Sequence, residues 1–197
     1  ASVHPARSPP QITACAKVPI TGRRQMKMLP KATLNSMAVT EYRNFLSQHP
    51  PVSTGAQKEM VVRVGQRIQK ATENYFKAIG KEKYLEGYKW EFNLVNDAAV
   101  NAWCMPGGKV VVYTGLLPVT QTEEGLAVVM GHEIAHAIAQ HGNERMSQQY
   151  RAQNIGKAGQ VLVGVGAGQG AADLFGATYG VGAGLTLLKY SRTHESE

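Results

Sequence analysis

The sequence predicts an α+β domain in which helices surround a small antiparallel or mixed sheet. Several segments have the three- and four-residue apolar spacing or the end signals of helices. Two short segments have the alternating or β-branched pattern of strands. The length of 197 residues, with 43% hydrophobic and 18% charged residues, suits one globular domain with a sizeable core.

The first 31 residues are predicted to form an extended basic arm. They contain five of the nine prolines and no sustained apolar periodicity. Residues 1–50 carry seven basic side chains and one acidic side chain, which accounts for +6 of the net charge of +7. Such an arm can associate with an anionic membrane surface, and a solvated tail is an equal alternative. The rest of the chain is nearly neutral, so no nucleic-acid partner is expected.

A possible lipidation site lies within this arm. The segment from Ile12 to Cys15 resembles the lipobox of bacterial lipoproteins, whose cysteine is lipidated after signal cleavage. The apolar segment that should precede a lipobox is missing, because Ala1–Gln11 is polar and rich in proline. Cys15 is therefore a candidate lipid anchor, with a plain loop cysteine as the alternative. With Cys104 as the only other cysteine, a disulfide framework is excluded.

Two helices and two strands are predicted in the first half of the chain. The helices cover residues 34–48 and 56–79, and the second has an apolar stripe with basic residues outside it. Apolar and polar residues alternate around Trp90–Leu94, as in a half-buried strand. A second strand, Val110–Tyr113, is a β-branched run that follows a turn at Pro106-Gly107-Gly108.

The helical pattern returns from Thr122 to Gln140. Thr120 and Glu123 have the spacing of a capping box at its start, and His141-Gly142 offers a stop at its end. Another helix is expected from Asn143 into the 150s.

Glycine is concentrated in residues 156–184, which hold ten of the 21 glycines. This segment lacks the Lys-Ser or Lys-Thr ending of a phosphate-binding P-loop. Asp173 and several polar residues interrupt it, so closely packed or mobile helices are favoured over a membrane span.

Residues His132 to His136 read His-Glu-Ile-Ala-His, the HExxH pattern, inside a predicted helix. Helix residues four apart lie on one face, so both imidazoles can reach one metal ion. Imidazole suits Zn²⁺, and two such ligands leave room for a third protein ligand and a water. Glu133 flanks this face and can act as the base that activates the water for attack on a peptide bond. The structural alternative is two histidines one turn apart beside a solvated glutamate.

The third zinc ligand has to come from elsewhere in the chain. His141 lies five residues beyond His136 and fits a role at a helix C-terminus better than the extended metzincin pattern. His194 and Glu195 are adjacent near the end of the chain, and spacing alone does not decide between them. Glu195 is predicted, because two histidines and a carboxylate form an established catalytic zinc set.

Several segments together resemble a known peptidase family. They are Asn101–Lys109, Thr114–Leu117, His132–His136 and Gln140–Ser147. In these segments the chain is similar to the HtpX and type I CAAX-prenyl-protease family of gluzincin zinc metallopeptidases, and most to its soluble, periplasmic, lipoprotein-like branch. The resemblance covers about residues 35–197.

This resemblance implies a zinc ligand and a domain boundary. The third ligand of the family is the first glutamate of a Glu-x-x-Ala-Asp motif, and Ser191–Glu197 matches the start of that motif at Glu195. The chain ends before the Ala-Asp pair. The zinc metallopeptidase domain, residues 32–197, is therefore expected to be truncated at its C-terminus.

The resemblance also implies a substrate site. The second predicted strand would be the edge strand that flanks the HExxH helix, where an extended substrate adds as a further strand. The residues of this predicted substrate strand are Lys109, Val110, Val111, Val112 and Tyr113. The alternative is a plain sheet edge that Lys109 helps to protect. Cys104 is near this site in sequence, and a small buried thiol is its expected role.

The HExxH pattern predicts hydrolysis of peptide bonds, and the resemblance implies that the substrates are unfolded or damaged cell-envelope proteins of the bacterial periplasm. His132, His136 and Glu195 would bind Zn²⁺, and Glu133 would be the catalytic base. One alternative is a zinc-bearing chaperone or assembly factor with weak or latent hydrolysis. A second alternative is a basic-arm module that binds membrane or nucleic acid, in which the histidines are incidental.

Overall fold

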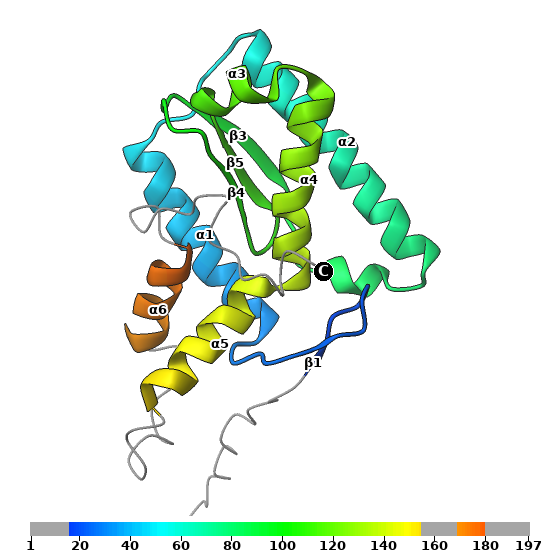
Figure 1. Ribbon diagram of the computed structural model, residues 1–197, viewed down its shortest axis with the longest axis vertical. Coiled ribbons are helices and arrows are strands. Elements are labelled where there is room, and N and C mark those ends of the chain that lie inside the picture. Colours follow the sequence, from blue (N-terminus) through cyan, green and yellow to red (C-terminus); the bar gives the residue numbers. More distant parts are fainter. Residues whose placement is uncertain (1–15, 155–168, 180–197) are drawn as a thin grey trace, which may run out of the picture.

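A three-stranded mixed sheet lies at the centre of the computed structural model, which describes residues 16–154 and 169–179 (Figure 1). Its strands are β3 (Glu91–Val95), β4 (Ala102–Met105) and β5 (Lys109–Tyr113). The spatial order is β3-β5-β4, with β5 parallel to β3 and antiparallel to β4. Helices surround this sheet, so the predicted α+β class is confirmed.

The turn between β4 and β5 explains why these two strands form a hairpin. Gly107 and Gly108 have φ angles of 80° and 83°, a region that glycine enters without steric cost. A Cβ atom on Gly108 would lie 2.7 Å from the ring of Trp90. The predicted turn is therefore confirmed, and it pairs Met105 with Lys109.

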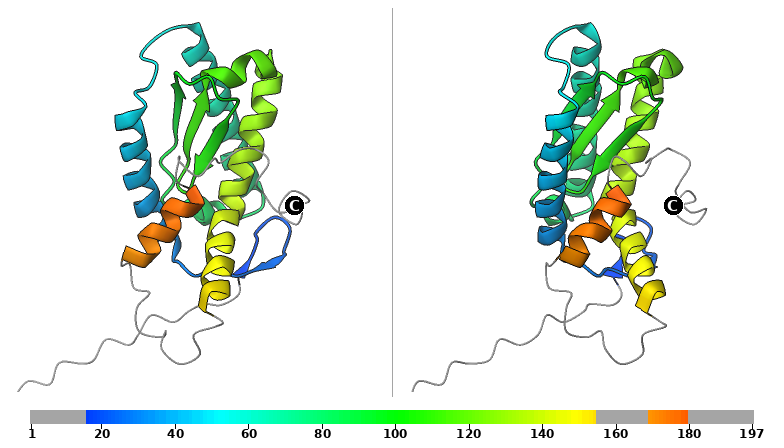
Figure 2. Two further views of the ribbon diagram at one scale, coloured as in Figure 1. Left: turned by 60° about the vertical axis from the view of Figure 1, so that its left-hand side comes forward. Right: turned by 90° about the vertical axis from the view of Figure 1, so that its left-hand side faces the viewer.

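Helices cover both faces of the sheet. Helix α1 (Lys31–Gln48) lies on one face, whereas α2 (Ala56–Ala78) and α4 (Glu123–Ala139) lie on the other, as both views in Figure 2 show. Successive strand residues point to opposite faces, which divides the core into two clusters. Cys104, Val110 and Val112 join the α2–α4 cluster. Trp103, Val111 and Tyr113 join the α1 cluster.

The remaining helices are short or lie near the end of the described chain. They are η1 (Glu82–Leu85), η2 (Thr114–Leu116), α3 (Leu117–Thr120), α5 (His141–Asn154) and α6 (Gln169–Tyr179). Helix α6 packs against α1 and α5, and the rest of the glycine-rich segment lies outside the described residues. None of the helices in the described ranges has the length and apolar character needed to cross a bilayer.

The predicted substrate strand is not an edge strand. Strand β5, whose residues are Lys109, Val110, Val111, Val112 and Tyr113, pairs with β3 on one side and with β4 on the other. Its backbone groups are therefore used within the sheet, and all five residues are buried. The edge strand that packs against α4 is β4, so the predicted arrangement of an edge strand beside this helix is correct but the strand is different.

The described part of the predicted arm is structured. Strands β1 (Ala16–Lys17) and β2 (Arg24–Gln25) form a two-stranded antiparallel hairpin. This hairpin is bound to the end of α4 and to α5, beside which it lies in Figure 1. Residues 16–30 are thus part of the folded unit, because their polar groups find partners there that the sequence pattern did not reveal.

Candidate metal centre

The two histidines of the HExxH pattern meet on α4. The Nε2 atoms of His132 and His136 lie 2.9 Å apart, and their rings are nearly perpendicular, at 86°. His132 is half-buried, whereas His136 is 5% exposed. Thr122 begins this helix, since its side-chain oxygen accepts a hydrogen bond of 3.1 Å from the amide of Gly125. The predicted cap at Thr120 was therefore wrong by two residues.

The paired imidazole nitrogens fit a zinc ion. Two nitrogens bound to tetrahedral zinc at about 2.05 Å lie about 3.3 Å apart. A small rotation of either ring would convert the observed separation into that geometry. Within residues 16–154 and 169–179, no third histidine, cysteine or carboxylate completes a three-ligand group. Any further protein ligand has to come from the remaining residues, which include both His194 and Glu195.

Glu133 lies on the inner side of α4, where its side chain is 2% exposed. It is close enough to Cys104 on β4 for its charge to act on the thiol. Burial raises the pKa of Cys104 well above its usual range, and the Glu133 carboxylate raises it further. Cys104 is 6% exposed, so the expectation of a buried thiol is confirmed. The thiol therefore stays protonated, while Glu133 occupies a protected position between helix and sheet.

A sharp bend separates α4 from α5. Gln140 adopts the left-handed conformation, with φ 58° and ψ 36°, and ends α4 at Ala139. His141 then begins α5, so the predicted stop at His141-Gly142 is replaced by this bend. The bend brings Nδ1 of His141 to 2.6 Å from Nδ1 of His136, and His141 is 3% exposed.

Polar side chains from two other segments, η1 and the N-terminal hairpin, hold this bend in place. The hydroxyl of Tyr84 donates to the Ile138 carbonyl over 2.8 Å. The side-chain amide of Gln25 donates to the Ala139 carbonyl over 2.9 Å. Arg23 forms a two-pronged ion pair with Glu144 at 2.7 and 2.8 Å. Side chains from other elements therefore fix the C-terminal end of α4, the helix that carries His132 and His136.

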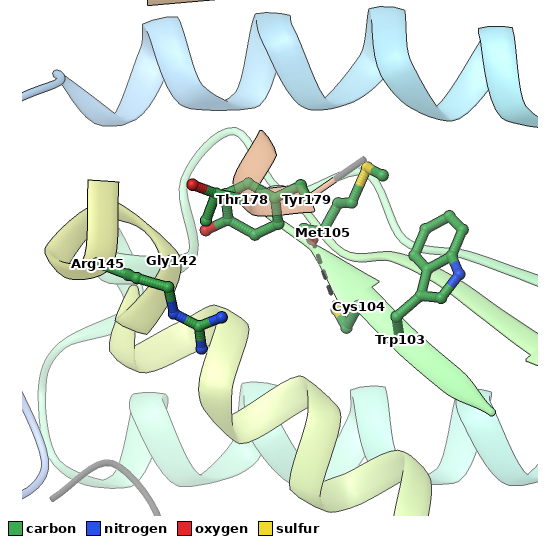
Figure 3. Close-up of a pocket in the computed structure, with 7 residues that line it drawn as sticks. All are labelled: Trp103, Cys104, Met105, Gly142, Arg145, Thr178 and Tyr179. Carbon is green, nitrogen blue, oxygen red and sulfur yellow. Dashed lines mark hydrogen bonds between the residues drawn. The ribbon is translucent and has the colours of Figure 1, made fainter. Parts of the chain in front are cut away.

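The far side of α5 packs against α6 next to β4, which is an outer strand of the sheet that the described residues form. Figure 3 shows Tyr179 of α6 between Gly142 of α5 and Met105 of β4. A Cβ atom on Gly142 would lie 1.7 Å from the Tyr179 hydroxyl oxygen, so a side chain there is excluded unless Tyr179 moves. These elements enclose a cavity of about 10 Å³, enough for one water molecule. Its lining residues are Trp103, Cys104, Met105, Gly142, Arg145, Thr178 and Tyr179.

Comparison with known proteins agrees with this geometry. Residues 64–197 match the model of peptidase family M48, a stretch that includes the sheet, both histidines and the bend. The chain belongs to peptidase family M48.

Three M48 relatives illustrate the extent of the likeness. A mitochondrial metalloendopeptidase OMA1 of Arabidopsis thaliana is 43% identical over 91 residues, which is 46% of this chain and 19% of that protein. The Schizosaccharomyces pombe OMA1 is 30% identical over 130 residues, 66% of this chain and 36% of that protein. A beta-barrel assembly-enhancing protease of Escherichia coli is 31% identical over 112 residues, 55% of this chain and 23% of that protein. The M48 chain thus spans between a fifth and two fifths of these relatives' lengths.

The structure brings only some of the predicted site residues of this M48 chain together. His132, Glu133 and His136 are adjacent, as the HExxH spacing predicted. The side chain of Lys109 lies on the opposite face of the sheet, where its ammonium group pairs with the Glu91 carboxylate at 2.5 Å. Cys15, His194 and Glu195 lie outside the described residues. The contact between His141 and His136 was not predicted from the sequence. It depends on the left-handed backbone conformation of Gln140, which residues other than glycine rarely adopt.

Proposed function

We propose that this M48 chain is a zinc-dependent endopeptidase that hydrolyses peptide bonds in unfolded or damaged cell-envelope proteins. The observation that carries the proposal is the 2.9 Å approach of the His132 and His136 Nε2 atoms beside the buried Glu133. The family is one of peptidases, and the relatives are named metalloendopeptidases or proteases. The alternative of incidental histidines has no support from this arrangement.

Each residue of the proposed site has a separate role. His132 and His136 would hold zinc through Nε2, with Glu195 as the third ligand. When bound, zinc acidifies water and polarises a peptide carbonyl. Glu133 takes a proton from the attacking water and passes it to the leaving amine. Its burial fixes the carboxylate and limits competing hydrogen bonds from bulk solvent.

The substrate is proposed to bind along β4, in place of the strand that was first predicted. An edge strand offers unused N–H and C=O groups to an extended peptide. Strand β4 is at the sheet edge and packs against the helix that carries His132 and Glu133. Backbone pairing of this kind has little sequence preference, which suits unfolded polypeptides as substrates.

One observation favours a second candidate, a zinc-bearing chaperone or assembly factor with weak or latent hydrolysis. All four residues of β4 are buried, and Thr178 and Tyr179 of α6 lie beside the strand (Figure 3). A covered edge would slow the entry of substrate. Casein turnover that a chelator abolishes supports the peptidase, whereas zinc-dependent binding of unfolded casein without turnover supports the second candidate.

Glu195 is proposed as the third ligand on the basis of the motif match. Replacing Glu195 with Ala should strip zinc from the protein, because two imidazoles alone hold the ion weakly. Replacing His194 with Ala serves as the matched control and should leave the zinc content unchanged. Loss of metal in the His194 variant alone would identify His194 as the ligand instead.

The proposed location is the bacterial periplasm, with a lipid anchor on Cys15 at the outer membrane. The lipobox resemblance and the likeness to the soluble, lipoprotein-like branch of the HtpX family support this part of the proposal. Mass spectrometry of the native mature protein should detect diacylglyceryl on Cys15. A mature protein that begins before Cys15 and carries a free thiol there would contradict it.

The decisive experiment is the replacement of Glu133 with Gln. The amide keeps the shape of the side chain but cannot accept the proton, so casein hydrolysis should fall by about a hundredfold or more. Zinc content should stay at the wild-type level, because Glu133 is not a ligand. Glu124→Gln changes an exposed carboxylate on the same helix and should preserve both properties. Undiminished hydrolysis in Glu133→Gln would place the catalytic site elsewhere.

A further inference from the structure

We infer that His141 is a positioning residue that fixes the tautomer and ring orientation of His136 for metal binding. The inference rests on the proposed function, since it concerns the same zinc site. It adds a residue that the HExxH pattern does not contain. The contact that carries it is the 2.6 Å approach of the two Nδ1 atoms.

The contact exists only because the backbone bends at Gln140. In a continuous helix, residues five apart differ by about 500°, so their side chains point about 140° away from each other. The left-handed conformation of Gln140 breaks this relation and starts α5 in a new direction. His141, as the first residue of α5, thereby faces back onto His136.

The direction of this hydrogen bond follows from metal binding. A neutral imidazole carries one proton, and His136 can bind metal through Nε2 only if that proton is on Nδ1. An Nδ1–H of His136 needs an acceptor, and the Nδ1 atom at 2.6 Å is that of His141. His141 must therefore accept at Nδ1 and carry its own proton on Nε2. The Nε2 lone pair of His136 is then directed toward His132, where the ion is expected.

The position of His141 is itself firmly held. Its two neighbours along α5 are fixed by the packing of Gly142 against Tyr179 and by paired hydrogen bonds between Asn143 and Leu29. The ion pair of Glu144 with Arg23 adds a third attachment, 2.7 Å long. An acceptor held this rigidly limits rotation of the His136 ring before metal binds, which reduces the entropic cost of binding.

Two substitutions of His141 distinguish the effect of its hydrogen-bond acceptor from the effect of its side-chain volume. His141→Leu fills the site but removes the acceptor that faces His136. His141→Asn places an amide oxygen as many bonds from the backbone as Nδ1, so it can accept the same hydrogen bond. His49→Asn is the matched control, because His49 stacks on Phe45 at the end of α1, in a different part of the fold.

The test is titration of the purified protein and its variants with Co²⁺, followed by visible absorption, and with Zn²⁺ against a chromophoric chelator. His141→Leu should bind both ions about 10–100-fold more weakly than wild type, the usual effect of losing a partner of a metal-ligating histidine. His141→Asn and His49→Asn should stay within about threefold of wild type, since both keep the hydrogen bond to His136. Wild-type affinity in His141→Leu, or equal weakening in the Leu and Asn variants, would overturn the inference.

A spectroscopic measurement on the metal-free wild type tests the same point without a variant. Long-range ¹H–¹⁵N correlation spectra should show His136 protonated on Nδ1 and His141 protonated on Nε2. The opposite tautomers would refute the assigned direction. If the wild-type protein binds neither Co²⁺ nor Zn²⁺, the proposed zinc site itself is wrong. If the wild type binds both ions and the His141 variants bind them equally well, only the role inferred for His141 is wrong.

Discussion

At the scale of single residues, two glycines on neighbouring helices have opposite surroundings. Gly142 faces the ring of Tyr179, and an added Cβ would come within 1.7 Å of its oxygen. Gly131, directly before His132 on α4, has no atom within 4 Å of the position of an added Cβ. The same substitution at the two positions should therefore have opposite effects on stability.

Gly142→Ala should lower the free energy of unfolding by about 1–3 kcal/mol, the typical cost of overpacking a filled site. Gly131→Ala should raise it by up to about 1 kcal/mol, because alanine has the higher helix propensity. Guanidinium unfolding curves measure both values. In a Tyr179→Leu background the cost at Gly142 should shrink, and an unchanged cost there would show that Tyr179 is not its cause.

The residues of the metal site could be predicted only in part from the sequence. His132, Glu133 and His136 follow from the regular spacing of a helix, which fixes their common neighbourhood without tertiary information. The approach of His141 depends on one backbone angle at Gln140. The sequence predicted that a helix ends near His141-Gly142, but glutamine is uncommon in the left-handed region, so the bend at Gln140 and the direction in which it points His141 could not be predicted.

At the scale of elements, the bend between α4 and α5 requires a strained backbone conformation at Gln140. Substitutions at this position can measure the effect of that strain on the free energy of unfolding. Gln140→Gly should change the free energy of unfolding little, because glycine adopts φ 58° without strain. Gln140→Val should cost about 1–3 kcal/mol more, since a β-branched residue is strongly disfavoured there. Both variants lose the weak 3.4 Å hydrogen bond to Tyr84, so their difference isolates the backbone effect.

Thermal and chemical denaturation of the two variants would measure this difference. Gln48→Val in the last turn of α1 is the control and should cost only a few tenths of a kcal/mol through helix propensity. Equal stability of the Gly and Val variants at position 140 would mean that the bend is not needed to reach the folded state.

The helices with strong apolar periodicity or clear end signals could be predicted from the sequence, whereas the strands could be predicted only in part. Helices α1, α2 and α4 have apolar stripes or end signals and match the predictions to within three residues. Strand β4 was missed because all four of its residues are buried, which leaves no alternation to detect. The family resemblance implied an edge position for Val110–Val112, which is wrong, and a β-branched run of this kind is typical of a strand buried on both faces.

At the scale of the whole molecule, the buried thiol of Cys104 links global stability to pH. Its pKa is raised by burial and then by Glu133, from an unfolded value near 9.0. Above pH 9 the unfolded chain releases the thiol proton and the folded chain keeps it, so the free energy of unfolding must fall as pH rises. One such group lowers it by about 1 kcal/mol between pH 9 and pH 10.

Unfolding curves at pH 9 and pH 10 should show this fall in the free energy of unfolding of the wild type. In Cys104→Ala the fall between the same two pH values should be about 1 kcal/mol smaller. The alanine variant also starts from a lower stability because it leaves a small cavity, so only the change with pH is compared. Tyrosines such as the half-buried Tyr84, whose pKa burial raises to about 12, contribute mainly above pH 10. Identical pH slopes in the two proteins would assign the effect to other groups.

The N-terminal hairpin has a consequence for the order of events during synthesis. Its contacts reach far along the chain, since Arg23 pairs with Glu144, 121 residues later, and Gln25 bonds Ala139, 114 residues later. At about 5–20 residues per second, the ribosome needs roughly 6–24 s to make that intervening stretch. The residues of this hairpin are made before α4 and α5, yet they can reach these packing partners only after both helices have been made. Val18, 1% exposed when folded, stays open to proteases and holding chaperones throughout that interval.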